Sequence, residues 1–344
     1  MIKIEIILLT NNTCLPFQRL NEEYGLDFIE LNKLFASKSL AEHGIGFLIN
    51  IYDIDRLDDQ WNPILLKNII FDTGGSNLTF LHNLDIRGYN LHDLDHIILS
   101  HWHYDHSGAL YTILERLKNG IQVICHNDAK FERFFRRSND ITKSDLEGKT
   151  REEILPLLSA SKIVNQEPID LGRIEKLNAK IFFPITHYEL LNIKGLRITL
   201  SGEIPRKYSI EDFDNFFSLQ NGTLEIDKIL DDKCLIFEYD EHVVLLNGCC
   251  HSGLMNTLEY VKDLTDKPVS CIIGGIHMAN ASEDRIRETR EYLRTFQNYD
   301  RPVYIFPIHC SGERIIGEIN KIKFPEIKAF NASVGTIFTF TSNF

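Results

Sequence analysis

The feature that most constrains the fold of this chain is a run of metal-ligand side chains within the segment SHWHYDHSG at residues 100–108. Three histidines and one aspartate fall within six positions: His101, His103, Asp105 and His106. They come directly after the apolar run 97–99, which predicts a buried strand. Packing gives no reason for such a cluster, so we expect a strand that ends in a metal-binding loop.

The spacing of the four side chains indicates how they divide. Alternate residues of an extended segment point to the same side, so His101 and His103 can hold one metal ion. After the chain turns, Asp105 and His106 can hold a second ion. Imidazole and carboxylate suit Zn, Fe or Mn better than Ca or Mg. We expect one or two transition-metal ions per chain, zinc before iron or manganese. Two ions about 3.5–4 Å apart activate a water and polarise a phosphoryl or carbonyl group.

Three later histidines stand in equivalent places. His251, His277 and His309 each follow a predicted strand, and these strands cover residues 243–246, 272–273 and 303–306. Loops at the ends of neighbouring strands cluster in space, so their shared position makes all three candidates for the same site.

The order of predicted elements defines the fold class. A strand-turn-helix rhythm in both halves predicts an α+β fold of two mixed β-sheets, packed face to face with helices outside, in a single domain over residues 1–344. Residues 127–180 are charged, with helical periods near 131–137 and 152–158. No Pro/Gly/Ser-rich linker brackets them, so we expect a helical insertion rather than a separate domain; whether it closes over the site stays open.

Composition narrows the function classes. The formal charge of -12 disfavours nucleic-acid binding. Apolar runs are too short to cross a bilayer, and the N-terminus lacks a signal-peptide pattern. Seven irregularly spaced cysteines do not indicate a disulfide framework. We therefore expect a cytoplasmic protein with a small-molecule substrate, no nucleic-acid partner and no membrane partner; the oligomeric state stays open.

The motif of residues 101–106 resembles the signature of the metallo-β-lactamase superfamily. That resemblance covers almost the whole chain and implies a four-layer αβ/βα sandwich with a mono- or dinuclear metal site at one edge. More narrowly, the chain resembles the branch of 7,8-dihydropterin-6-methyl-4-(β-D-ribofuranosyl)aminobenzene 5′-phosphate synthases, which act in tetrahydromethanopterin biosynthesis. The motifs that carry the branch resemblance are EHG at 42–44, SGEIPR at 201–206, GCCHSG at 248–253, GGIH at 274–277 and HCSG at 309–312.

The resemblance also implies a ligand set. His251 would complete the site of His101 and His103, and His309 would complete the site of Asp105 and His106. Asp72 in the segment FDTG would support the metal loop from behind. Many members of the superfamily have an aspartate that bridges both metals where Cys249 and Cys250 stand here. Adjacent cysteines rarely bind one ion together, so we expect at least one to be buried as a structural residue. The number of metals and any bridging ligand stay open.

Other residues have predicted roles near the reaction. Asp105 is a candidate catalytic residue that orients the attacking water. His277 is a second, which binds metal, contacts the substrate or moves a proton. Arg206 is a candidate for holding an anionic group of the substrate, since guanidinium binds phosphate bidentately; a solvated surface arginine is the alternative. We interpret Asp232 as an ordinary residue at the start of a strand.

These residues together predict a metal-dependent hydrolase that acts on a small, anionic substrate of a phosphorylated or pterin-like kind. Tetrahydromethanopterin biosynthesis is the pathway that the branch implies. A non-catalytic small-ligand sensor on the same scaffold is the alternative. A diiron oxidoreductase on this fold is disfavoured, because that class typically has glutamate where His103 stands.

Overall fold

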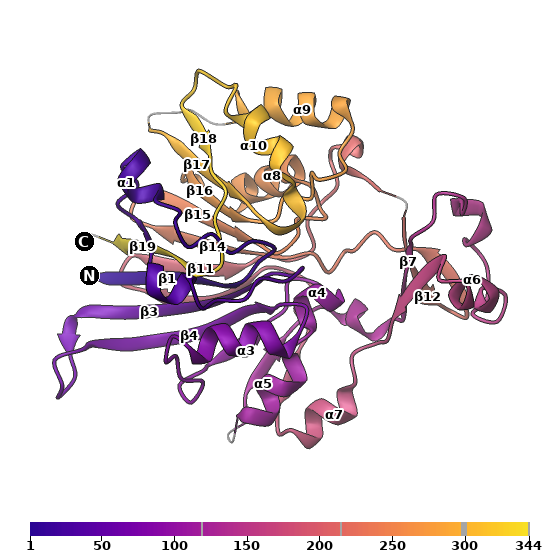
Figure 1. Ribbon diagram of the computed structural model, residues 1–344, viewed down its shortest axis with the longest axis horizontal. Helices are drawn as coiled ribbons and strands as arrows, with labels where there is room; N and C mark the ends of the chain where they lie inside the picture. The colour runs from indigo at the N-terminus through magenta and orange to yellow at the C-terminus, as the bar shows by residue number, and fades with distance from the viewer. Residues whose placement is uncertain (118–119, 214, 297–300, 343–344) are drawn as a thin grey trace.

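Two large β-sheets packed face to face form the body of the protein in the computed structural model (Figure 1). The structure describes residues 1–117, 120–213, 215–296 and 301–342. The first sheet has eight strands, in the order β2 (Ile29–Leu31), β19 (Thr336–Ser342), β1 (Ile2–Thr10), β3 (Gly46–Leu57), β4 (Pro63–Thr73), β5 (His96–Ile98), β6 (Gln122–Ile124) and β9 (Lys180–Phe182). It is mixed: β1 and β3 are antiparallel to their neighbours, whereas β4, β5, β6 and β9 run parallel.

The second sheet has seven strands and is also mixed. Their order is β10 (Tyr188–Ile193), β11 (Leu196–Leu200), β14 (Cys234–Tyr239), β15 (His242–Asn247), β16 (Val269–Gly274), β17 (Val303–Pro307) and β18 (Ile327–Ala329). The last four strands run parallel to one another. Their carboxyl ends therefore lie at one edge of the sheet.

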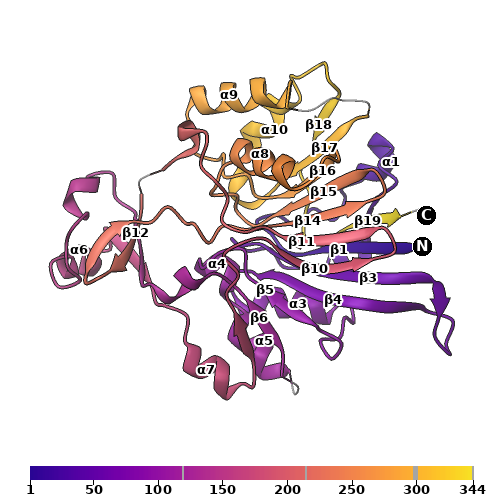
Figure 2. The same cartoon turned by 180° about the vertical axis from the view of Figure 1, so that it is seen from behind.

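Helices cover the outer face of each sheet, which gives four layers (Figures 1 and 2). The first sheet packs against α3 (Asn77–Asp85), α5 (Leu110–Arg116) and α7 (Leu171–Lys176). The second packs against α8 (Leu254–Leu264), α9 (Glu283–Leu293) and α10 (Glu313–Ile319). Short helices α1 (Leu20–Tyr24) and α2 (Lys33–Ala36) flank β2. The predicted α+β sandwich of two mixed sheets is confirmed.

Alternation along β1 shows how the layers are held together. Ile2, Ile4 and Ile6 lie in the core between the two sheets, whereas Ile7 and Leu9 lie in the core between the first sheet and its helices. A strand buried on both faces needs apolar residues at consecutive positions, and residues 6–9 of β1 are all apolar and buried, whereas Lys3 and Glu5 near its start are partly buried and pair with each other. In the described part of the chain, no helix is long and apolar enough to span a membrane.

The predicted helical insertion at 127–180 requires a correction. The segment contributes two strands, β7 (Arg133–Arg136) and β8 (Ile163–Gln166), besides helices α6 (Leu155–Ser159) and α7. They join β12 (Phe216–Gln220) and β13 (Thr223–Ile226) in a four-stranded antiparallel sheet that projects from the body (Figure 1). The expected helix at 131–137 is strand β7, because its pairing partner β12 lies far along the chain and is invisible to local periodicity.

Candidate metal centre

The metal loop is attached to the end of the neighbouring strand by Asp72. This aspartate is the next-to-last residue of β4, has a left-handed backbone (φ 59°) and is fully buried. Its Oδ1 accepts a hydrogen bond from the Ser100 backbone N–H at 2.7 Å, and its Oδ2 accepts from the Ser100 hydroxyl at 2.6 Å. The predicted supporting position of Asp72 behind the loop is therefore what the structure shows.

The loop closes on a glycine that no other residue can replace. The Gly108 N–H donates to the Gly74 carbonyl at 2.8 Å. A Cβ at Gly108 would lie 2.2 Å from the carbonyl oxygen of Gly75, too close for any side chain. This contact presses helix α4 (Tyr104–Ser107), which carries Asp105 and His106, onto the end of β4.

Each histidine of the loop is oriented by a specific neighbour. His106 Nδ1 lies 2.6 Å from Asp72 Oδ2, which turns its Nε2 into the site. His101 Nδ1 lies 2.9 Å from the Ser100 hydroxyl, and its Nε2 lies 3.0 Å from His103 Nδ1. A carboxylate or hydroxyl on one ring nitrogen fixes the orientation in which the other nitrogen can bind a metal.

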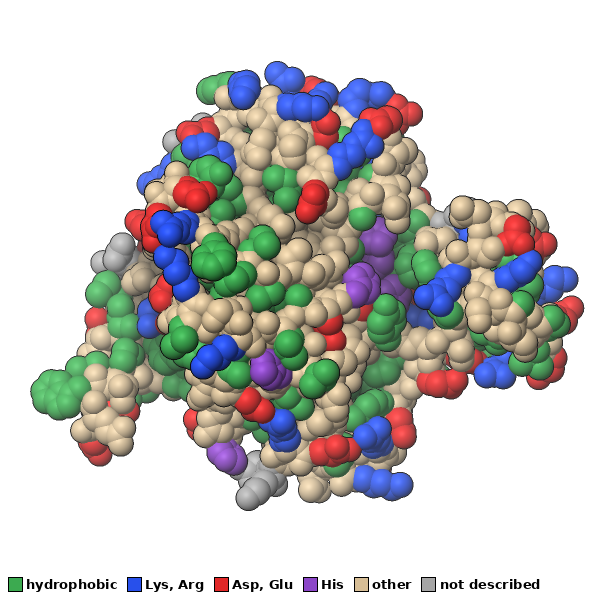
Figure 3. Space-filling model, viewed as in Figure 1, with side chains coloured by type: hydrophobic (Ala, Val, Ile, Leu, Met, Phe, Trp, Pro, Cys, Tyr) green, Lys and Arg blue, Asp and Glu red, His purple; other side chains and the backbone are tan. Residues whose placement is uncertain are grey.

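The strand ends of the second sheet bring the later histidines to the same place. The His251 ring centroid lies 4.7 Å from that of His101 and 5.0 Å from that of His103. His309 Nε2 lies 3.3 Å from Asp105 Oδ2, and its ring centroid is 5.1 Å from that of His106. All six predicted ligands thus converge on one site; that they bind metal stays a prediction. In Figure 3, histidine side chains gather where the small sheet meets the body.

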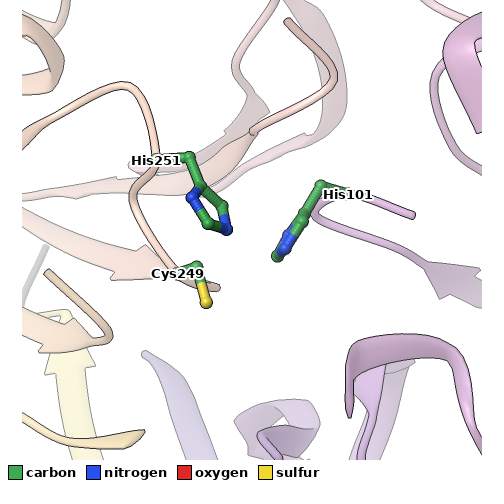
Figure 4. Close-up of side chains that lie close together, drawn as sticks. All are labelled: His101, Cys249 and His251. Atoms are coloured by element: carbon green, nitrogen blue, oxygen red, sulfur yellow. The ribbon is translucent and has the colours of Figure 1, made fainter. Parts of the chain in front are cut away.

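Within the described residues, potential ligand atoms form four groups in which all atoms lie within 4.8 Å of one another. The first is His101, Cys249 and His251, shown in Figure 4. The second is His106, Cys249 and His309. The others are Cys249, His277 and Cys310, and finally His43, Asp105 and His309.

The donor set fits a transition metal. Both ring nitrogens of His251 are buried and have no hydrogen-bond partner in the part of the chain that the structure describes. A buried polar atom without a partner costs about 1–3 kcal/mol, and a metal bond would remove that cost. Neutral imidazoles with a thiol and a carboxylate suit Zn or Fe rather than Mg or Ca. His101, His103 and His251 would hold one ion, and Asp105, His106 and His309 the other.

Sequence reasoning missed two residues of this site. Cys249 was expected to be structural as readily as Cys250, yet its thiol belongs to three of the four groups. His43 was noticed only as part of a motif; its Nε2 lies 3.2 Å from Asp105 Oδ2, and its side chain is about half exposed. The EHG motif was the available signal for His43, but nothing in its spacing connects it to Asp105.

His277 lies beside the centre rather than in it. Its ring centroid is 4.3 Å from that of His251, and it groups with Cys249 and Cys310. Its backbone is left-handed (φ 48°), which turns the chain sharply after β16. Its predicted roles as a metal, substrate or proton-transfer residue stay predictions.

Arg206 is already occupied by backbone groups. Its Nη1 donates to the His251 carbonyl at 2.5 Å, and its Nη2 donates to the Lys228 carbonyl at 2.6 Å. These bonds hold the loop that carries His251. The predicted role in binding an anionic substrate stays a prediction, and it would have to compete with these two contacts. Asp232, expected to be an ordinary strand-start residue, accepts a hydrogen bond from the Ser252 N–H at 2.8 Å in the same loop.

The histidines differ in how readily they give up a proton. Burial, together with neighbouring positive groups, lowers the pKa of His103 to about 3 and places those of His101 and His251 well below the usual value. Burial opposes protonation of His106 too, but Asp72 and Asp105 outweigh it and raise the pKa of His106 to about 9. In the metal-free protein, His106 therefore carries a proton at neutral pH.

Metal binding at His106 is accordingly expected to release at least one proton and to strengthen with pH. Because a metal requires the neutral ring, the apparent affinity should rise at least about tenfold per pH unit up to pH ~9. In the metal-free protein, the raised pKa of His106 stabilises the folded state below pH ~6.5. This contribution is lost as the pH rises through about 9. Titration calorimetry in buffers of different ionisation enthalpy measures the released protons. A metal affinity independent of pH between 7 and 9 would contradict this assignment.

Comparison with known proteins decides the fold family. Residues 62–187, which include the metal loop, match the model of the Metallo-beta-lactamase superfamily. The solved structure of Tm1679, described as a metal-dependent hydrolase of the beta-lactamase superfamily, is similar with a TM-score of 0.65. The match covers 99% of this chain and 100% of that one, at 18% identity. The chain has the metallo-β-lactamase fold. The resemblance stated from the motifs is therefore confirmed.

Two proteins of Methanocaldococcus jannaschii are similar in sequence to this chain with the metallo-β-lactamase fold. The uncharacterized protein MJ0448 is 29% identical over 287 residues, 83% of this chain and 90% of that protein. A 7,8-dihydropterin-6-methyl-4-(β-D-ribofuranosyl)-aminobenzene-5′-phosphate synthase is 26% identical over 263 residues, 76% of this chain and 79% of that enzyme. The metallo-β-lactamase fold implies metal ions, and the four groups of ligand atoms are candidate positions for them.

Proposed function

We propose that the protein is a metal-dependent hydrolase that acts on a small phosphorylated or pterin-like substrate. The observation that carries the proposal is the convergence of ligand side chains from both sheets, with His251 buried and lacking a hydrogen-bond partner among the described residues. Bound there, metal ions would supply an activated water and polarise the bond to be cleaved.

The chain's own residues would prepare this site for the reaction. Asp72 fixes the His106 ring at 2.6 Å, so Nε2 faces the centre. Asp105, held 3.2 Å from His43 and 3.3 Å from His309, is placed to orient a water molecule. Phe216 stacks on His103 at 5.0 Å between ring centroids, so strand β12 of the small sheet lies against the predicted ligands of the first ion.

The substrate class rests on a relative rather than on the site. The dihydropterin synthase of M. jannaschii is named for the compound it makes, in which a dihydropterin is linked through its 6-methyl group to a ribofuranosyl aminobenzene that carries a 5′-phosphate. We propose a substrate of that kind, small and anionic, and we extend the proposal to the same biosynthetic branch. A cytoplasmic protein without nucleic-acid or membrane partners remains the expectation from composition.

The test is metal-dependent turnover. Chelator-treated protein is expected to lose hydrolysis of bis(p-nitrophenyl) phosphate and to regain it when Zn, Mn or Fe(II) is added, because the metal supplies the nucleophile. The same preparations are then incubated with 7,8-dihydropterins and with 4-(β-D-ribofuranosyl)aminobenzene 5′-phosphate, and conversion is followed by chromatography. Tight binding of a dihydropterin without turnover of any substrate would replace the enzyme with a sensor. Less than about a tenth of an equivalent of transition metal in purified protein would reject the metal site itself.

A further inference from the structure

Gly248, the residue that follows strand β15, packs directly against Ser100 and Asp72, which support the metal loop. A Cβ at Gly248 would lie 2.1 Å from the Ser100 hydroxyl oxygen and 2.8 Å from Asp72 Oδ2. Only glycine fits, so the backbone passes directly behind the pair that orients His101 and His106. The residue after Gly248 consequently emerges between those two histidines, and that residue is Cys249.

The Cys249 thiol is placed between the two groups of predicted ligands. Its Sγ lies 3.1 Å from His106 Nε2. It is within 4.8 Å of ligand atoms of His101 and His251 on one side, and of His106 and His309 on the other (Figure 4 shows the first set). Two ligands of one tetrahedral zinc, with bonds of about 2.3 Å to sulfur and 2.0–2.1 Å to nitrogen, lie about 3.5 Å apart. The observed spacing is compatible with a sulfur that serves both positions.

We infer that Cys249 supplies a thiolate ligand shared by the two metal positions. The inference rests on the metal site of the proposed function but on no substrate or turnover. It gives this centre a soft sulfur donor where carboxylate and imidazole otherwise prevail, which favours Zn or Fe over Mn.

The neighbouring thiols lie elsewhere. Cys250 has a left-handed backbone (φ 60°) and turns into the core beneath α8, where its Sγ lies 3.4 Å from the Thr257 hydroxyl. Cys310 Sγ lies 3.4 Å from the Cys249 carbonyl oxygen and shares a group of potential ligand atoms with Cys249 and His277, so it is too close to the centre to serve as a control. Cys250 is the matched control, because it is a buried thiol next to Cys249 in the chain and belongs to none of the four groups found among the described residues.

The experiment is cobalt substitution monitored by absorption. Co(II) added to metal-free wild-type protein is expected to produce a near-ultraviolet thiolate-to-cobalt charge-transfer band that grows with both the first and the second equivalent. Cys249→Ser should lose the band and bind Co(II) at least about tenfold more weakly. Cys249→Asp should bind two equivalents without the band, because a carboxylate can also bridge two ions. Cys250→Ser should keep the band.

Two results would overturn the inference: a band that persists in Cys249→Ser, or a band that saturates at one equivalent when two are bound. If the serine variant fails to fold, X-ray absorption of the zinc-loaded wild type decides, with a sulfur neighbour at about 2.3 Å expected and its absence contradicting the inference. The proposed function fails independently. A thiolate band without turnover would reject the hydrolase and keep the ligand, whereas metal-dependent hydrolysis without a band would do the reverse.

Discussion

Replacing His103 with alanine is expected to remove metal from the first position and to lower phosphodiester hydrolysis at least about a hundredfold. Loss of a partner that only orients a ligand costs about 10–100-fold in metal affinity or activity, and loss of the ligand itself costs more. His103 Nδ1 lies 3.0 Å from His101 Nε2, and its ring lies 5.0 Å from that of His251, so its side chain adjoins both other predicted ligands of the first ion. Metal content by mass spectrometry and kcat/KM on bis(p-nitrophenyl) phosphate measure the two effects.

His92 provides the matched control for this variant. It is an exposed histidine between α3 and β5, and its backbone N–H rather than its ring is engaged by Asn90. His92→Ala should therefore leave metal content and kcat/KM at wild-type levels. A His103→Ala protein that keeps both its full metal complement and its activity would remove this residue from the centre.

Replacing Arg133 with methionine is expected to destabilise the protein by about 3–5 kcal/mol. The guanidinium is buried and lies 2.8 Å from Asp231 Oδ1 and 3.0 Å from Asp227 Oδ2. Removing the positive charge leaves two buried carboxylates uncompensated, which is far more costly than losing an exposed pair. Arg133 also donates to the Trp102 carbonyl at 3.1 Å, so the small sheet is fastened to the metal loop through this residue. The shift in the urea midpoint, with metal removed, measures the loss.

Arg151 offers a comparison within the same small sheet. Its guanidinium pairs with Glu132 at 2.9 Å, but its side chain is 43% exposed. Glu132 is itself buried but keeps a hydrogen bond from the Asn165 side-chain amide at 2.9 Å, so Arg151→Met should lose less stability than Arg133→Met. If Arg133→Met were as stable as Arg151→Met, the buried cluster would not fasten the small sheet as described.

Local sequence patterns predicted the elements whose structure depends on residues close together in the chain. The strand at β1 and the clustering of the side chains from His101 to His106 depend on residues next to one another in the chain, so alternation and spacing were sufficient to predict them. The same holds for the histidines that follow β15 and β17, because parallel strands deliver their ends to one edge. These contacts follow from the sheet topology once the strands are known.

Contacts between distant segments were the ones that local patterns could not predict. Strand β7 was expected to be a helix from its local periodicity. Its pairing partner β12 comes much later in the chain, so the local pattern could not reveal the strand. The distinction between Cys249 and Cys250 depends on the close approach of Gly248 to Ser100 and on a left-handed turn at Cys250. Neither condition leaves a trace in residue spacing, so two adjacent cysteines looked equivalent in the sequence.

The pairing of β1 with β19 sets the order in which the molecule can be assembled. Ile2 lies opposite Ser342 in the interior of the first sheet, and both labelled ends of the chain lie together in Figure 2. During synthesis, the isoleucine-rich edge of β1 has no strand to cover it until residues 336–342 leave the ribosome, and an open edge of that kind invites aggregation. Since His309 follows β17, a metal site that includes it can be completed only after both sheets have been synthesised.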